Sequence, residues 1–176
     1  MRDESPLERR FWRFWLAGLL LLAVQIVMNV WLMIDISPLG ISDHQAAGSA
    51  ARVDAIQFGW IAAGVMKLAV ISMAVDLLYI GVYGWGAFAG GRMFAVSKMP
   101  ALARLGKITM IATIGYCLAD YAETICQFAQ AAATGGNDAL AWVAATARPI
   151  KSVLFLVTFF AILLTLAVRR RKRRMA

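Results

Sequence analysis

Four apolar segments with few charges alternate along the chain with short basic or glycine-containing connections. They cover residues 14–36, 56–88, 108–133 and 152–168. A helix needs about 20 apolar residues to cross a bilayer. The last segment is shorter, but Lys151 and Arg169 at its ends can snorkel toward the interfaces. The pattern predicts one all-α membrane domain over residues 1–176, folded as an antiparallel bundle of four transmembrane helices.

Composition narrows the class of protein. Of the 176 residues, 61% are hydrophobic and 16% are charged, whereas soluble domains are about half apolar and a quarter charged. A soluble globular enzyme and a disordered chain are therefore excluded. No catalytic motif is found, so the sequence leaves an enzymatic activity open and favours binding. His44 has only Asp43 beside it and no second histidine or thiol pair, so neither a metal site nor a cofactor is predicted.

Basic residues gather on one side of the predicted membrane. The formal net charge is +8, and 14 of the 18 Lys and Arg residues lie in the N-terminal arm, the connection after the second segment and the C-terminal tail. This asymmetry predicts a multi-pass protein of the inner or plasma membrane with both termini in the cytoplasm. The basic run Arg169–Arg174, within the tail 169–176, is expected to contact anionic lipids of the inner leaflet. Nucleic-acid binding is not predicted, because the run continues a hydrophobic segment.

A stripe of polar residues follows the third segment at helical spacing. Successive members are 4, 3, 4, 3, 4 and 3 residues apart: Thr109, Thr113, Tyr116, Asp120, Glu123, Gln127 and Gln130. Such residues share one face of a helix, and in hydrocarbon that face must turn toward protein or water. Hydrogen-bonded contacts between helices explain the neutral members. The two carboxylates favour a polar cavity, a binding site or a proton route instead.

Other polar residues extend this candidate site. On the second segment, Lys67 lies at about the depth of Asp120 and Glu123, which predicts an ion pair with one of them. Asp76 shares a face of the same segment with two tyrosines, and the first segment contributes an amide pair one turn apart. The expected ligand-binding set is Gln25, Asn29, Lys67, Asp76, Tyr79, Tyr83, Tyr116, Asp120, Glu123 and Gln127.

Two short motifs in these segments resemble known membrane proteins. The run Asp76–Tyr83 and the run Asp120–Glu123 are similar to elements of uncharacterised bacterial four-span membrane proteins, although Thr124 stands where those have Asn. That resemblance implies a membrane location and no activity. Asp35, Asp76 and its tyrosines, and the basic tail also resemble the emopamil-binding and sigma-2 receptor (EXPERA) family. The sterol-isomerase branch of that family uses a membrane histidine that this chain lacks. This second resemblance therefore implies lipid or amphiphile binding without isomerase activity.

Three functions remain open from the sequence. The first is a small membrane protein whose acid-lined intramembrane pocket binds a lipid or an amphiphilic small molecule. The second is an interaction subunit or assembly factor whose polar stripe pairs with a helix of a partner membrane protein. The third is a proton-coupled transporter acting as a homo-oligomer. The direction in which the stripe of the third segment faces, into the bundle or out of it, separates the first function from the second.

Overall fold

The computed structural model describes the backbone of residues 5–175 and the side chains of residues 5–171. This part of the chain is helical, with one isolated bridge between Ile34 and Ser37 and no strand. The elements are α1 (Pro6–Val30), α2 (Ile41–Gln45), α3 (Ala50–Ala62), α4 (Met66–Ala95), α5 (Pro100–Ala133) and α6 (Asp138–Met175). Four of them, α1, α4, α5 and α6, are long and apolar enough to cross a membrane. The predicted all-α class with four candidate spans is confirmed.

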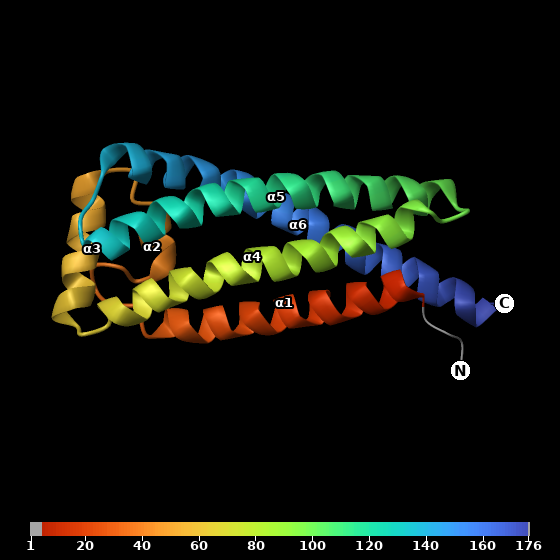
Figure 1. Cartoon of the computed structure of the whole chain (residues 1–176), viewed down its shortest axis with the longest axis horizontal. Coiled ribbons are helices and arrows are strands. Elements are labelled where there is room, and N and C mark those ends of the chain that lie inside the picture. The colour runs from red at the N-terminus through yellow and green to blue at the C-terminus, as the bar shows by residue number, and fades with distance from the viewer. Residues whose placement is uncertain (1–4, 176) are drawn as a thin grey trace.

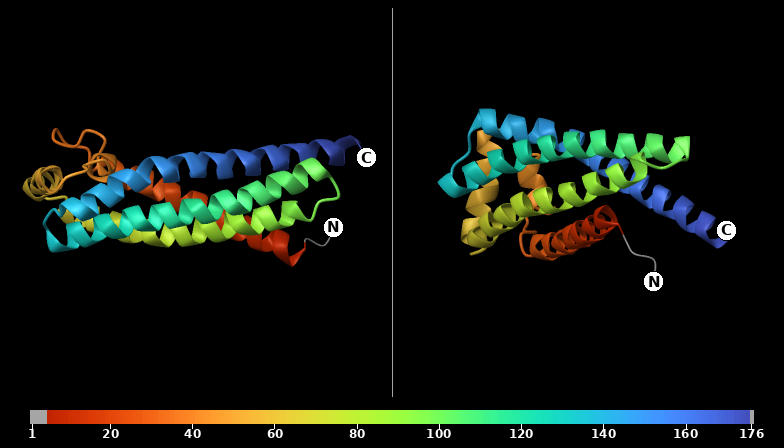
Figure 2. Two further views of the ribbon diagram at one scale, coloured as in Figure 1. Left: turned by 90° about the horizontal axis from the view of Figure 1, so that it is seen from above. Right: turned by 45° about the vertical axis from the view of Figure 1, so that its right-hand side comes forward.

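The four long helices run back and forth along one axis (Figure 1). Helix α4 packs between α1 and α5, and α6 packs mainly on α5. Both termini lie at one end, while α2 and α3 lie at the other, where α3 crosses the ends of the long helices (Figures 1 and 2). Helix α6 runs obliquely, so it lies beside α5 near α3 and reaches α1 near the termini.

Local signals explain where several helices begin and end. The Ser5 side chain accepts a hydrogen bond from the backbone N–H of Glu8, capping α1, and a proline opens both α1 and α5. Helix α5 ends at Ala133, and Thr134, which follows it, has a left-handed φ of 51°. Asn137 accepts a hydrogen bond from the N–H of Leu140 before the first turn of α6. These caps satisfy backbone groups that the helix itself cannot pair.

The segment expected as one span over 56–88 is two helices. Helix α3 ends at Ala62 and α4 begins at Met66, with Gly64 between them at a φ of +72°, a conformation that favours glycine. Helix α3 is apolar because it packs on the bundle end: Ile56 and Trp60 are fully buried, and Trp60 Nε1 donates to the carbonyl of Leu32. The predicted span was too long at its start because the hydrophobic run includes part of α3, which is too short to cross a membrane.

The last helix also differs from the sequence prediction. It begins at Asp138 rather than Ser152, and it carries Pro149 inside its length. Lys151 is therefore a residue of the helix interior instead of a residue at the end of a span. The basic run continues the same helix, and the side chains of residues 172–176 lie outside the described part of the chain.

The half of the bundle nearer the termini, called here the terminal half, is closed by aromatic and glycine contacts. It comprises residues 11–18 of α1, 83–94 of α4, 100–113 of α5 and 159–169 of α6. Trp15 and Phe159 join α1 to α6 with ring centroids 6.2 Å apart, and a Cβ at Gly86 would overlap the backbone of α1. At the terminal edge, Arg169 Nη1 lies 3.1 Å from Glu8 Oε1.

Candidate functional site

The polar stripe of α5 faces the interior of the bundle. All seven members are buried: Thr109, Thr113, Tyr116, Asp120, Glu123, Gln127 and Gln130. The hydroxyl groups of Thr109 and Thr113 donate to backbone carbonyls one turn earlier in α5, so their hydrogen bonds are made within the helix. The inward orientation predicted from the spacing is thereby confirmed, and the stripe is covered by helices of the same chain.

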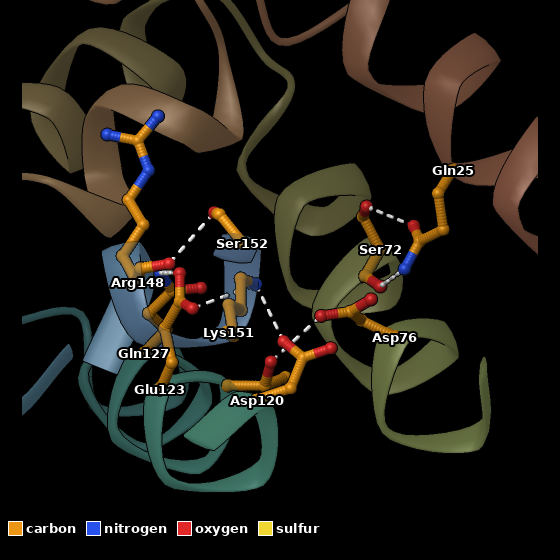
Figure 3. A network of polar contacts seen from close by, with 10 residues as sticks. Gln25, Ser72, Asp76, Asp120, Glu123, Gln127, Arg148, Lys151 and Ser152 are labelled. Carbon is orange, nitrogen blue, oxygen red and sulfur yellow. Dashed lines mark hydrogen bonds and ion pairs between the residues drawn. The ribbon is translucent and has the colours of Figure 1, made fainter. Parts of the chain in front are cut away.

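A lysine of α6 neutralises part of this stripe. Lys151 Nζ lies 2.6 Å from Asp120 Oδ1 and 2.8 Å from Glu123 Oε2, as Figure 3 shows. The two carboxylate side chains are 3% and 0% exposed, while the lysine is 15% exposed. One ammonium group therefore bridges two buried carboxylates that are one helical turn apart. Taking it away would leave both charges without a partner in a region of low dielectric constant.

The predicted ion pair between Lys67 and Asp120 or Glu123 is wrong. Lys67 lies in the first turn of α4 and is exposed, and the acids of α5 pair with Lys151 instead. The depth comparison treated residues 56–88 as one span, which placed Lys67 well inside the membrane. Because the chain breaks at Gly64, Lys67 lies near the end of the helix and is free to extend outward.

A second polar group lies where α1, α4 and α5 meet. Thr124 donates to Asp76 Oδ2 over 2.8 Å. Next to it, Gln25 and Ser72 form a reciprocal pair: the serine hydroxyl donates to Gln25 Oε1 over 2.8 Å, and Gln25 Nε2 donates to the serine carbonyl over 3.1 Å (Figure 3). Gln25 and Ser72 thus fix α1 to α4 at the level of Asp76.

A cavity lies between α1 and α6, beside this polar group. Its volume is about 430 Å³, and we call it the outer cavity. The polar lining includes Asp76, Asp120 and Lys151, together with Tyr79 and Tyr116. Apolar side chains from the two flanking helices form the remaining wall: Leu22 and Ile26 of α1, and Phe155 and Leu156 of α6. Short helix α2 borders it near α3.

A smaller cavity of about 70 Å³ adjoins the outer one, and we call it the inner cavity. Its polar lining comes from four helices: Gln25 of α1, Gln45 of α2, Ser72 and Asp76 of α4, and Gln127 of α5. Asp76 and Gln25 border both cavities. The two cavities therefore form an apolar-walled space with a small polar compartment behind it.

The charges around these cavities do not balance. Asp76, Asp120 and Glu123 face one cation, Lys151, which leaves a formal excess of two negative charges when all are ionised. Arg148 does not compensate, since its guanidinium points away from the carboxylates (Figure 3). Uncompensated charge inside a membrane bundle is costly, so this end of the cavities favours protons, a cation or a hydrogen-bond-donating ligand.

The remaining predicted residues divide between wall and core. Asn29 lines the outer cavity and accepts from the N–H of Ile41 over 2.7 Å, holding α2 against α1. Gln127 lines the inner cavity and donates to Glu123 over 3.5 Å. Tyr83 lines neither cavity; it is fully buried among aromatic rings, 5.4 Å from the ring of Phe155. Tyr83 therefore belongs to the packed core and not to the wall of either cavity.

Sequence reasoning missed two important residues, Lys151 and Thr124. The spacing of Thr124 from Asp120 and Gln127, 4 and 3 residues, already placed it on the polar face of α5. For Lys151 the signal lay upstream: Asn137 is a helix-capping residue, and the alanine-rich stretch after it favours helix. A helix starting there carries Lys151 to the depth of the acids.

Near the inner cavity, α2 and α3 hold a buried histidine. His44 stacks on Trp60 with ring centroids 5.3 Å apart, and its Nε2 lies 3.1 Å from Gln57 Nε2. Burial lowers the pKa of His44 from 6.5 to about 4. The imidazole is thus neutral at pH 7 and acts as a packing group. Among the described residues, no three His, Cys, Asp or Glu side chains form a group able to hold a metal ion.

Comparison with known proteins adds no relative: no family model, no curated protein and no solved structure matches this chain.

Proposed function

We propose that this membrane protein binds a lipid or another amphiphilic small molecule in the outer cavity. The observation that carries the proposal is the cavity itself: about 430 Å³ with apolar walls and, at one end, Asp76, Asp120 and Lys151. Binding sites for small molecules commonly have this volume and combine apolar walls with a few convergent polar groups. An amphiphile matches both parts of the lining at once.

The flanking helices supply a route from the surrounding lipid. Ile26 on α1 and Leu156 on α6 line the cavity and are also exposed, so the cavity opens sideways between these helices. Toward the termini the same helices close on each other through Trp15 and Phe159. In this proposal the apolar part of the ligand extends through the lateral opening, where its surface stays in hydrocarbon.

The polar end of the ligand is expected to donate hydrogen bonds. Ionised carboxylates only accept, and Lys151 already bridges Asp120 and Glu123. A hydroxyl or amine group fits this end better than a phosphate or carboxylate, which would add negative charge to an existing excess. Tyr79 and Tyr116 border the same end and offer aromatic faces and hydroxyl groups.

The inward stripe argues against the interaction-subunit hypothesis. A stripe that pairs with a partner helix must be accessible, whereas the side chains of Asp120, Glu123 and Gln127 are covered by α4 and α6. The proton-coupled transporter remains an alternative because it needs the same carboxylates. Ligand-dependent proton uptake into vesicles that contain the purified protein would favour the transporter over a binding protein.

The topology proposed for this function places both termini in the cytoplasm of the inner or plasma membrane. The start of α1 and the end of α6 lie on one side of the bundle (Figure 1), and most basic residues of the sequence belong to the segments on that side. The run Arg169–Arg174 would then contact the anionic inner leaflet. The outer cavity would open in the half of the membrane away from the cytoplasm, near α2.

Native mass spectrometry of gently purified protein tests the proposal. The native chain is expected to retain an amphiphile that Leu156→Trp, which fills the cavity, releases. The matched control is Leu164→Trp, which adds the same side chain at an exposed position of α6 outside the cavity. Equal retention of the same molecule by both variants would contradict the proposal, as would a native chain that carries no bound molecule.

A further inference from the structure

We propose that the inner cavity binds a small monovalent cation of the size of Na⁺, with the carboxylate of Asp76 as its charged ligand. The inference goes beyond the proposed function, because the cation site does not require an amphiphile in the outer cavity. It rests on the chemistry of the lining, the size of the inner cavity and the excess of negative charge beside it.

The lining supplies oxygen atoms of the kind that hard cations prefer. Three of the five polar residues are glutamines, one is a serine, and the fifth is Asp76. Carboxylate, amide carbonyl and hydroxyl oxygens are ligands for hard cations such as Na⁺, Mg²⁺ and Ca²⁺. One carboxylate among neutral oxygens balances a single positive charge. With a divalent ion, the ion and its ligands together would carry one uncompensated positive charge.

Two amide groups have capacity left for a ligand. Gln127 is 1% exposed, and its Oε1 accepts no hydrogen bond from the described part of the chain. Gln45 makes no side-chain hydrogen bond with the described residues, although it borders both cavities. Gln127 is buried and Gln45 is half-buried, and both side chains border the inner cavity. A cation, with or without a water molecule, would give both carbonyl oxygens a partner.

Size separates this site from the outer cavity. A volume of about 70 Å³ accommodates a few water-sized groups, which suits a partly dehydrated Na⁺ and excludes a lipid head group. The reciprocal pair of Gln25 and Ser72 forms one wall and is already held rigidly. Thr124 fixes one oxygen of Asp76 from outside the cavity. Ligand positions that are set in advance reduce the cost of ordering a site around the ion.

The surrounding charge increases the attraction for a cation. Asp120 and Glu123 share one lysine, so their group carries a formal negative charge in addition to that of Asp76. In a region of low dielectric constant this field is screened little by salt in the medium. A bound Na⁺ would remove one of the two excess charges without protonating a carboxylate.

Thermal unfolding in detergent tests the site at constant ionic strength and pH, with choline chloride replaced stepwise by NaCl, LiCl or KCl. NaCl is expected to raise Tm by roughly 5 °C or more in a saturable manner, as a ligand specific for the folded state does. KCl is expected to have a smaller effect. An identical response to NaCl, LiCl and KCl, or no response to any of the three, would overturn the proposal.

Variants assign the response to the inner cavity. Asp76→Asn keeps an acceptor for Thr124 and removes the charge, so Tm without Na⁺ should rise and the Na⁺ response should disappear. Glu123→Gln removes a neighbouring charge that does not line the cavity, and it should retain a Na⁺ response. If Asp76→Asn does not fold, Gln127→Met provides the second test and is expected to weaken the response. A full response in Asp76→Asn or in Gln127→Met would contradict the site.

The same measurement on Leu156→Trp separates this inference from the proposed function. That variant fills the outer cavity, so the amphiphile is expected to be lost while the Na⁺ response persists. Loss of the Na⁺ response in Leu156→Trp would show that the cation site depends on the outer cavity, contrary to the proposal.

Discussion

The terminal half of the bundle and the half that contains the cavities are built from the same four helices but hold them together differently. Near the termini, α1 meets α6 through Trp15 and Phe159, and Gly86 lets α4 approach the backbone of α1. Near α2, α1 and α6 are separated by the outer cavity, and Lys151 joins α6 to α5. Close apolar packing maintains the first region, whereas paired charges maintain the second.

This difference assigns separate roles to the two regions. Interiors of proteins are normally packed to high density, and a void costs stability because the atoms that line it lose contacts. An open space of about 430 Å³ beside an excess of buried negative charge is expensive in both respects. Among the described residues of the terminal half, no carboxylate or ammonium group is buried. We therefore regard the terminal half as the part that holds the helices together and the cavity half as the part that binds.

The largest expected effect is the loss of Lys151. Replacing it with Met leaves Asp120 and Glu123 without their shared partner, which typically costs about 3–5 kcal/mol of unfolding free energy. Lys67→Met is the matched control and should change it by less than about 0.5 kcal/mol, because Lys67 is exposed. Unfolding of both variants in detergent measures the contrast.

Removing the acids should rescue that loss. In the Lys151→Met background, Asp120→Asn combined with Glu123→Gln is expected to restore most of the stability, because no unpaired charge remains. If Lys151→Met is as stable as Lys67→Met, the ion pairs do not maintain the cavity half.

Acidification should destabilise the end of the bundle that α2 and α3 cover. The folded pKa of His44, about 4, lies below its ordinary 6.5, so the unfolded chain takes up a proton first as the pH falls. The contribution of His44 to the unfolding free energy is therefore fully present above about pH 6.5. It decreases as the pH falls toward 4, by up to about 3 kcal/mol. His44→Phe keeps an aromatic ring beside Trp60 and should lack this part of the pH dependence. Identical pH profiles for the two proteins would show that His44 is not buried in its neutral form.

Added bulk at a close contact should weaken the terminal half. A Cβ at Gly86 overlaps the backbone of Phe14 and Trp15, so Gly86→Ala is expected to cost about 1–3 kcal/mol by overpacking. Gly135→Ala is the control, since its Cβ approaches only the carbonyl of Ala133, at 4.0 Å. Ligand retention per folded molecule should stay unchanged in Gly86→Ala, because the cavity half is not altered. A loss of ligand without a loss of stability would reverse the roles assigned to the two halves.

The smallest expected effect is at the terminal edge. Arg169→Gln breaks the ion pair with Glu8, and both side chains are partly exposed, so it should cost less than about 1 kcal/mol. The effect should decrease further at high salt concentration, where surface charges are screened. Thermal unfolding in low and high salt measures it. A loss comparable to that of Lys151→Met would show that charge also maintains the terminal half.

The lengths of the apolar runs predicted the four long helices, and helical spacing predicted the inward face of α5. Asp120 and Glu123 were found in the same way. The partner of these acids could not be found by comparing depths, since the comparison needed the true ends of the helices. The break before α4 falls at Gly64 within a continuous apolar run, so the run length did not reveal it. Pro149 is typical of a helix start, although α6 begins earlier, at Asp138.

The cavities depend on a property that no local pattern contains. They exist because α6 crosses obliquely from α5 to α1, so the spacing between α1 and α6 widens toward α2. That crossing results from contacts far apart in the chain, such as Trp15 with Phe159 and Lys151 with Asp120. Asp76 could be named from the sequence as a polar residue in a span, but not as an acidic residue that borders two cavities.

An experimental structure of the protein, crystallised in a lipid phase without prior removal of bound lipid, tests the central claim most directly. We expect continuous density between α1 and α6 in the cavity half, with its polar end within hydrogen-bonding distance of Asp76 or Asp120 and its apolar part passing Ile26 and Leu156. Helices α1 and α6 packed together along their whole length, with no space between them, would contradict the account.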